Sequence, residues 1–365
     1  ERHLEKFART LNSRITNVSP DLKFRFLEAA LSITGEHDEM ATSSEIYDYY
    51  RDLVTEIELV ASLDGSDQVG REPFGLFVNL HHTREIERES GGFQRYLQNQ
   101  NNSTSFSYNF GRPTEDYRDK FEKAARAALE EHFEIISVTF HTDKIESHTS
   151  ARPGWRTTPY VYFLLKSKGP QIDTIPPLKI DLDFLDTSGY VVLPISSANL
   201  PVDSSGEAEE RPFRELKVTM TLDEREAEEK GNWYLEVKTR SEGLVPPLAS
   251  LLELPPAGFE LAGTGDQDLQ IDELSTQTDD GAPLSSHEYR ISLKPKGEAP
   301  TGFTFPALTE TATAALAAED AILRQRYVDV DLLPVGETVE LAVKPGSSLW
   351  MWLLGIGVLI AAGAI

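Results

Sequence analysis

The stretch LKIDLDFLDTSGYVVLPI, at residues 178–195, carries the clearest structural signal in the chain. Its first half alternates apolar residues with lysine and aspartate, which is the period of a strand that buries one face. The tetrapeptide DTSG at 186–189 has residues typical of a tight turn, and 190–195 is apolar again. The stretch therefore predicts a β-hairpin within an antiparallel sheet.

The same alternation continues over most of the chain from about residue 134 onward. Short strands at this spacing are typical of antiparallel β-sandwiches, and the proline pairs at 246–247 and 255–256 indicate a boundary. We therefore expect two Ig-like antiparallel β-sandwiches, at 134–245 and 246–345, with an alanine-rich helix at 312–326. The other predicted strands lie around Ile136/Val138/Phe140, Leu216/Val218/Met220/Leu222, Trp233/Leu235/Val237, Leu269 to Leu274, Tyr289/Ile291/Leu293, Val328/Val330/Leu332 and Val339/Leu341/Val343.

Residues 1–65 are predicted to be helical. The tripeptide SPD at 19–21 combines a capping hydroxyl, a proline at the first helical position and an acid near the positive end of the helix dipole. The tetrapeptide TSSE at 42–45 fits a capping box, which predicts a further helix. The apolar positions of these helices are Phe24, Leu27, Leu31, Ile46, Tyr50, Leu53, Ile57 and Val60.

Residues 66–133 are predicted to be a mixed α/β region. A short strand is expected at 74–80, and a helix interrupted by Gly91-Gly92 is expected around 83–98. The polar stretch 98–107 has the composition of a loop, and Pro113 begins a helix that continues to about Phe133. The fold class expected for the whole chain is therefore α+β and multidomain.

The run LWMWLLGIGVLIAAGAI, at residues 349–365, contains no charged or strongly polar residue. A helix needs about 20 apolar residues to cross a bilayer, with a lower limit of about 17. Trp350 and Trp352 stand at its start, where indole rings favour the membrane interface. We expect a single transmembrane helix, truncated by a chain that is cut at both ends. The alternative is a buried helix of a soluble domain.

The composition excludes several classes of protein. The chain of 365 residues has a net charge of −25, which opposes general binding to nucleic acid. It contains no cysteine, so a disulfide framework, a thiolate zinc site and a cysteine nucleophile are all excluded. The acidic bulk of the chain favours an extracytoplasmic location, which would be the periplasm or the cell surface.

The densest cluster of ligand-type residues is His81-His82, with Glu85 three residues later. Neutral imidazoles and carboxylates bind zinc and other divalent ions, so this segment is the candidate for a metal-dependent or hydrolytic module. Adjacent histidines diverge in a helix or a strand, however, and the zinc motif on a helix places them four residues apart. The opposing interpretation is a charged, solvated segment.

Other acidic patterns have simpler interpretations. The DTSG tetrapeptide is similar to the active-site loop of aspartic proteases, but it has one residue too many and no second copy. Asp181 with Asp183, and Asp329 with Asp331, have the spacing to bridge calcium, although the water-facing side of a half-buried strand is the simpler interpretation. The acidic run at 223–230 is predicted to be a solvated hairpin loop.

The segment from Thr83 to Arg118 combines five arginines, several aromatic residues, a Gly-Gly break and many amides. Arginine and aromatic residues are favoured anchors of protein interfaces, so this segment is a candidate recognition surface. The alternative is a structured loop whose arginines pair with nearby acids.

The layout of two β-sandwiches followed by a membrane span resembles bacterial extracytoplasmic proteins of the aerotolerance-operon type. The likeness is architectural, covers only the chain from about residue 134 onward and implies no site residue. Together these features predict a non-enzymatic protein–protein interaction or assembly module without cofactor or metal. The bilayer and an unidentified protein are the expected partners, and the alternative is the enzyme module at His81, His82 and Glu85.

Overall fold

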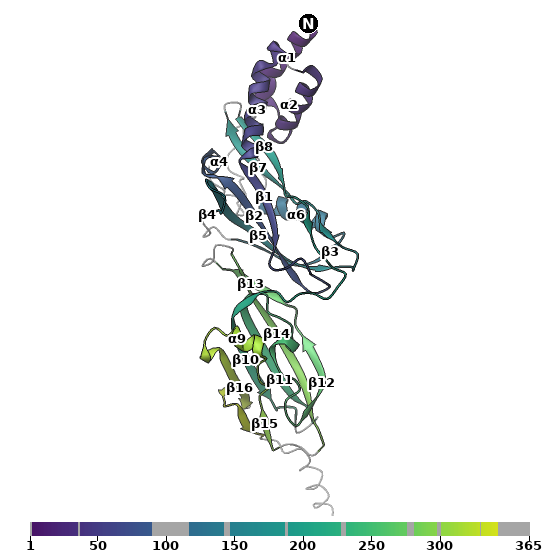
Figure 1. Ribbon diagram of the computed structural model, residues 1–365, viewed down its shortest axis with the longest axis vertical. Coiled ribbons are helices and arrows are strands. Elements are labelled where there is room, and N and C mark those ends of the chain that lie inside the picture. Colours follow the sequence, from purple (N-terminus) through teal and green to yellow (C-terminus); the bar gives the residue numbers. More distant parts are fainter. Residues whose placement is uncertain are drawn as a thin grey trace, which may run out of the picture. The chain divides into compact units, whose positions relative to one another are not determined.

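The computed structural model describes residues 2–35, 37–89, 117–141, 147–186, 189–227, 231–275, 281–297, 301–328 and 330–341. It is a mixed α+β structure with several antiparallel sheets (Figure 1). Contacts divide the chain into two compact units. Unit 1 contains the described residues of Glu1–Glu210 and Leu274–Gly281, and unit 2 contains those of Arg211–Glu273 and from Ala282 onward. The boundaries predicted at 134 and 246 fall inside unit 1 and unit 2, respectively.

Unit 1 begins with three helices, α1 (Arg2–Arg14), α2 (Pro20–Thr34) and α3 (Ala41–Thr55), separated by the 3-10 turns η1 (Ile15–Asn17) and η2 (Asp38–Met40). The predicted start of α2 at Pro20 is confirmed, although Ser19 makes no side-chain capping bond. The predicted end is also confirmed. Gly35 has a φ of 66°, which favours glycine, and its N–H donates to the carbonyl of Leu31 at 2.8 Å.

The capping box predicted at 42–45 is wrong. Helix α3 begins at Ala41, before this tetrapeptide, and its N-cap is Met40. Ser43 is buried inside the helix and donates its hydroxyl to Oδ1 of Asn12 on α1. The hydroxyl therefore joins two helices instead of capping one, a role that local sequence does not reveal.

The helical prediction for 1–65 is wrong from Ile57 onward, because β1 (Ile57–Leu63) is a strand. It pairs antiparallel with β2 (Phe74–Thr83), from Ile57 opposite His82 to Leu63 opposite Leu76. Ile57 and Leu59 are buried, so a period of two was present in the sequence. Helix α3 ends at Thr55, and the next apolar residues contribute to a sheet instead of a helical stripe.

The main sheet of unit 1 has the order β1-β2-β5-β3, with the short β4 (His148–Thr149) also on β5. Its other strands are β3 (Phe133–Phe140) and β5 (Trp155–Ser167). Residues 160–165 of β5 are all buried, so both faces of the sheet are covered there. Helix α6 (Tyr117–Leu129) packs on one face, with the Phe121 ring 5.1 Å from that of Tyr160.

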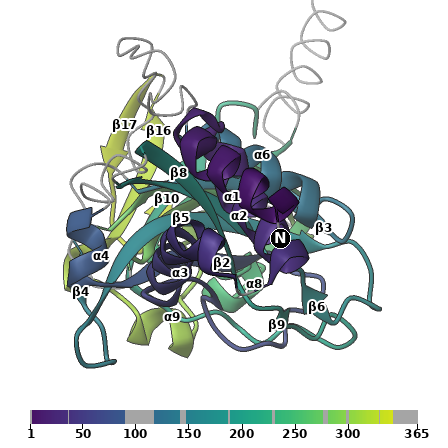
Figure 2. The ribbon, with the colours of Figure 1, turned by 90° about the horizontal axis from the view of Figure 1, so that it is seen from above.

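The hairpin predicted at 178–195 is confirmed as β7 (Lys179–Asp186) and β8 (Gly189–Ser196), which are paired from Lys179–Ser196 to Asp186–Gly189. Helices α2 and α3 contact β8, and α6 contacts β7 (Figure 2). Unit 1 also contains α4 (Arg84–Glu89) and a two-stranded sheet of β6 (Thr174–Ile175) and β9 (Leu200–Pro201). Leu178, Ile180, Leu182 and Phe184 join the helices in one hydrophobic core.

Unit 2 contains a seven-stranded sheet of order β12-β14-β11-β10-β16-β17, with β13 also on β14. A two-stranded sheet, β15 (Gly302–Thr304) with β18 (Thr338–Glu340), contributes Phe303 to the same core as Trp233 and Phe259. The strands of the larger sheet are β10 (Phe213–Asp223), β11 (Trp233–Gly243), β12 (Phe259–Asp266), β13 (Gln270–Leu274), β14 (Pro283–Pro295), β16 (Ile322–Val328) and β17 (Asp331–Pro334).

The expectation of purely antiparallel pairing is wrong for β10 and β16, which run parallel. Parallel neighbours require a long connection, and here four strands of the same sheet and two short helices lie between them in sequence. These helices are α8 (Leu248–Leu251) and α9 (Glu310–Ala314). Sequence periodicity shows where strands lie but not which strands become neighbours.

Two further predictions in unit 2 are wrong. The alanine-rich helix expected at 312–326 is only α9 followed by the 3-10 turn η3 (Glu319–Ala321), and β16 begins at Ile322. The strand expected through Val328, Val330 and Leu332 is a turn between two strands, with Val328 opposite Asp331. In both places a short helix or turn replaces a longer regular element.

Within the residues that the structure describes, no helix is long and apolar enough to cross a membrane. The predicted span at 349–365 lies outside the described residues.

Candidate functional site

His81 and His82 lie next to each other on β2, so their side chains point to opposite faces of the sheet. His82 is fully buried. Its Nδ1 lies 2.9 Å from the carbonyl oxygen of Thr83, and its Nε2 lies 2.8 Å from Oγ1 of Thr158. Burial lowers the pKa of His82, so the neutral ring donates from Nδ1 and accepts at Nε2. Both nitrogens of this ring are used in hydrogen bonds.

His81 is partly exposed on the other face, and burial also lowers its pKa, against an opposing effect of Glu58. Glu85 is exposed on α4. The structure therefore does not bring these three residues together. Among the described residues, no group of three histidine, aspartate or glutamate side chains is placed to hold a metal ion.

His82 instead belongs to a chain of hydrogen bonds that runs from the buried Thr158 to the partly exposed Glu87 and links α4 to β5. Ser147 Oγ lies 2.7 Å from Thr158 Oγ1 and 3.2 Å from Glu87 Oε1. The other oxygen of Glu87 accepts from Arg156 at 3.2 Å. The hydrogen-bond partners of His82 and Thr158 therefore come from β5 and from the loop before β4.

The candidate recognition segment from Thr83 to Arg118 is described only at its two ends, and 90–116 lie outside the described residues. At the first end, Thr83 Oγ1 donates to Glu56 at 2.6 Å and accepts from the N–H of Ile86 at 3.2 Å. At the second end, the guanidinium of Arg118 lies 5.6 Å from the centre of the Phe140 ring. Both ends are therefore fixed to the main sheet of unit 1.

The acidic patterns are more buried than predicted. Asp183 was expected to face water but is only 1% exposed, because α6 covers that face of β7. Asp181 pairs with Lys120 of α6 at 3.0 Å. Asp329 and the Thr187-Ser188 part of the DTSG turn lie outside the described residues.

The solvated-loop prediction for 223–230 is wrong at its start, because Asp223 and Glu224 are both buried. Two nitrogens of Arg225, Nε and Nη2, donate to the two oxygens of Asp223 at 2.8 Å each. Glu224 pairs with Arg326. The Arg225 guanidinium also stacks 3.9 Å from the centre of the Tyr327 ring. The charges of this network are paired with one another, which identifies it as a structural element of unit 2.

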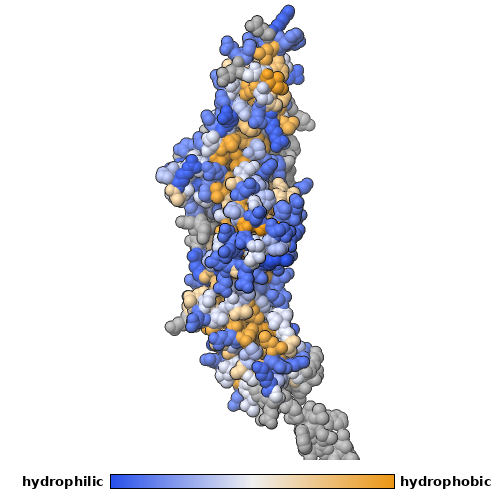
Figure 3. All heavy atoms as spheres, turned by 45° about the vertical axis from the view of Figure 1, so that its right-hand side comes forward, coloured by the Kyte–Doolittle hydropathy of each residue, from blue (hydrophilic) through white to orange (hydrophobic). Residues whose placement is uncertain are grey.

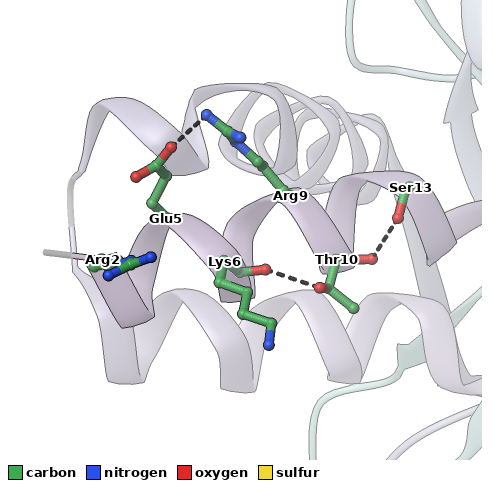
Figure 4. A pocket seen from close by; sticks show the side chains of 6 residues that line it. All are labelled: Arg2, Glu5, Lys6, Arg9, Thr10 and Ser13. Carbon is green, nitrogen blue, oxygen red and sulfur yellow. Dashed lines mark hydrogen bonds and ion pairs between the residues drawn. The ribbon is translucent and has the colours of Figure 1, made fainter.

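A shallow surface pocket on α1 is lined by Arg2, Glu5, Lys6, Arg9, Thr10 and Ser13 (Figure 4). All six side chains come from one helix, and their contacts are local. Arg9 pairs with Glu5, and the hydroxyl of Thr10 donates to the carbonyl of Lys6 at 2.8 Å. Neighbours at i and i+4 on a solvated helix explain this arrangement without a ligand.

The feature that sequence analysis missed is a second apolar face on α2. Leu22, Phe26 and Ile33 are 57%, 44% and 84% exposed, and Ala29 between them is exposed as well. These four residues follow spacings of four, three and four, the repeat of a coiled-coil seam, so they share one line along the helix. We call this line the α2 seam.

The α2 seam is additional to the face by which α2 joins the core. Leu27 and Ala30 are buried, and the ring of Phe24 stacks 5.5 Å from that of Tyr47 on α3. A surface helix needs only one apolar face to fold, so the seam has no role in the described unit. Figure 3 shows hydrophobic side chains among hydrophilic ones on this helical part of unit 1.

The seam could have been found in the sequence. Phe24, Leu27 and Leu31 already fill one face of α2, which leaves Leu22, Phe26 and Ile33 unexplained. An apolar stripe exposed on a stable helix is the pattern by which helices dock into apolar grooves or against other helices. No protein-family model and no curated protein matches this chain.

Proposed function

We propose that this chain is a membrane-anchored extracytoplasmic protein that acts as a protein–protein interaction or assembly module, and that it binds its partner through the α2 seam. The exposed seam is the observation that carries this proposal. Full burial of each large seam side chain would contribute roughly 1.5–3 kcal/mol, less what each already buries. A partner that presents an apolar helix or groove has the chemistry to cover it.

Two further proposals, on unit 2 and on residues 349–365, fit the same role. We propose that unit 2 is an Ig-like sandwich, since its larger sheet and the β15–β18 pair contribute to one core. We propose that 349–365 form the membrane span, because the run is continuously apolar.

The binding role is tested by the size of the complex that the full chain forms in its native membrane. After mild detergent extraction, we expect the wild-type chain to sediment as a complex larger than one copy and Ile33→Glu to sediment as a smaller species. Ser32→Glu is the matched control, because it introduces the same residue at a position that is exposed on the same helix but lies off the seam. A wild-type chain that sediments as a single copy would count against the proposal.

The anchoring role is tested separately by extraction of membranes with carbonate or high salt. A chain held by a membrane span stays in the pellet under both conditions. Release of the full-length chain into the supernatant would overturn the membrane assignment without affecting the α2 seam.

A further inference from the structure

Unit 2 exposes its large apolar side chains mainly on one hairpin. Among the described residues of this unit, every large exposed apolar side chain except Leu261 belongs to β16, β17 or the turn between them. Val330, in that turn, is 85% exposed. The others are Leu323, Val328, Leu332 and Leu333. Such a cluster on an edge strand indicates a contact with another apolar phase.

The chain leaves the described structure directly beside this hairpin. Leu333 of β17 pairs with Arg326 of β16, and Nη1 of Arg326 donates to the carbonyl of Glu340 at 3.0 Å. The next residue, Leu341, is buried and donates its N–H to Thr301 at 3.1 Å. The hairpin and the point of exit at Leu341 are therefore fixed to each other within unit 2.

The sequence after Leu341 is short. Residues 342–348 separate Leu341 from the apolar run at 349–365, and they span at most about 25 Å when fully extended. If that run crosses the bilayer, as proposed above, Leu341 is held within this distance of the membrane, and the hairpin that contacts the neighbouring Glu340 is held near it. The bilayer is then the apolar phase that these side chains can reach.

The charges of the hairpin specify the kind of bilayer surface. The sequence 322–334 contains two aspartates, Asp329 and Asp331, and two arginines, Arg324 and Arg326, and Arg326 is paired with Glu224. A polybasic cluster, which anionic lipids would attract, is missing from the sequence 322–334. The hairpin is suited to a zwitterionic surface, where carboxylates stay in the headgroup layer and the apolar side chains lie beside them.

We infer that the β16–β17 hairpin rests on a zwitterionic bilayer surface, with Val330 and Leu332 among the lipid headgroups. This inference rests on the proposed membrane anchor and adds a second contact to it. Two contacts with the bilayer would limit the tilt of unit 2 more than a single point of attachment would.

The test uses the full chain, whose lack of cysteine permits single labels. Val330→Cys carries an environment-sensitive fluorophore and is reconstituted into phosphatidylcholine vesicles that contain a lipid-bound quencher. Thr264→Cys is the matched control, because it is exposed on β12, at the opposite edge of the same sheet. We expect at least twofold stronger quenching at 330 than at 264. A label at Leu332→Cys should show the same preference.

Flotation of the vesicles separates the two proposals. A chain that floats but is quenched equally at 330 and 264 has an anchor and no hairpin contact, which overturns this inference alone. A chain that fails to float overturns the anchor and the hairpin contact together. Replacement of half the phosphatidylcholine by phosphatidylglycerol should weaken the quenching at 330, and stronger quenching there would overturn the zwitterionic assignment.

Discussion

The Oη of Tyr117 donates a hydrogen bond of 2.6 Å to Oδ1 of Asp183, which is 1% exposed. Tyr117 is the first residue of α6, and Asp183 lies in the middle of β7. The bond therefore fixes the start of the helix to the hairpin that it covers. It also explains how an aspartate in an alternating strand can face the inside of the protein.

Removal of this donor should weaken unit 1. In Tyr117→Phe, Asp183 stays buried without its partner hydroxyl, and hydrogen bonds to charged groups contribute about 1.5–3 kcal/mol. We expect a loss of that size in the free energy of opening of α6 and β7, measured by amide hydrogen exchange. Tyr190→Phe on β8 is the control and should change little. Equal losses in the free energy of opening for the two variants would show that the hydrogen bond to Asp183 does not stabilise α6 and β7.

The buried imidazole of His141 makes unit 1 sensitive to acid. Burial, and to a smaller extent the charge of His148, lowers the pKa of His141 from 6.5 to about 4. Because the folded state binds the proton less readily than the unfolded state, stability is complete above pH 6.5 and is lost as the pH falls toward 4. Between pH 7 and pH 5 this amounts to about 2 kcal/mol.

His141→Leu should remove that part of the pH dependence. Neither ring nitrogen of His141 has a hydrogen-bond partner among the described residues, so the replacement breaks no bond in that part of the chain. Hydrogen exchange of β3 and β5 at the two pH values measures the effect. The remaining slope belongs in part to His82, whose pKa burial also lowers. If the stability of His141→Leu depended on pH as strongly as that of the wild type, this assignment would be contradicted.

A methyl group at Gly281 should be costly. A Cβ placed there would lie 2.3 Å from Cε1 of His141, and Gly281 has a φ of +62°. Overpacking of this kind costs about 1–3 kcal/mol, and the backbone conformation adds about 1 kcal/mol. In the double variant with His141→Ala the packing cost should disappear while the backbone cost stays. Strictly additive effects in this cycle would exclude the contact with the ring.

Arg225 should matter more than an exposed arginine usually does. The hydrogen bonds from Arg225 lower the pKa of Asp223 below its ordinary value of 3.8. The stability that these bonds supply is therefore present above pH 3.8, and it is lost as the pH falls through the lower pKa of Asp223 in the folded state. Arg225→Leu should cost about 2–4 kcal/mol at pH 7, reduced by Arg290 nearby. Urea unfolding of unit 2 should show the gap between wild type and variant narrowing below pH 3.8. Arg214→Leu is the control, since Arg214 pairs with Glu242 nearer the surface.

Local patterns were sufficient for several strands and for the start and end of α2. The alternation at 178–195 and around Met220, Leu235 and Ile291 corresponds to observed strands, because each strand buries one face. Local patterns did not predict features that depend on contacts between segments far apart in the sequence. Ser43 donates a hydrogen bond to Asn12 of another helix, and the parallel pairing of β10 with β16 joins segments far apart in sequence.

The candidate site shows the same limit. Adjacent histidines indicated a metal cluster, whereas the sheet sends His81 and His82 to opposite faces and supplies Thr158 as the partner of His82. The apolar residues of the α2 seam are visible in the sequence. Only the burial of Leu27 and Ala30, however, shows which face of α2 packs on the core and that the seam residues are exposed. An apolar stripe can be identified as a candidate binding surface once the buried face of its helix is known.

The most direct test of the central proposal is single-cysteine accessibility along α2 in the native membrane, which the cysteine-free chain permits. A membrane-impermeant thiol reagent is applied to the folded chain at each of the positions 22, 25, 26, 28, 29, 32 and 33. We predict protection at 22, 26, 29 and 33 and rapid reaction at 25, 28 and 32, with the protection lost after the complex is dissociated by detergent. Reaction at 26 and 33 as fast as at 28 in the native membrane would contradict a partner bound on the α2 seam.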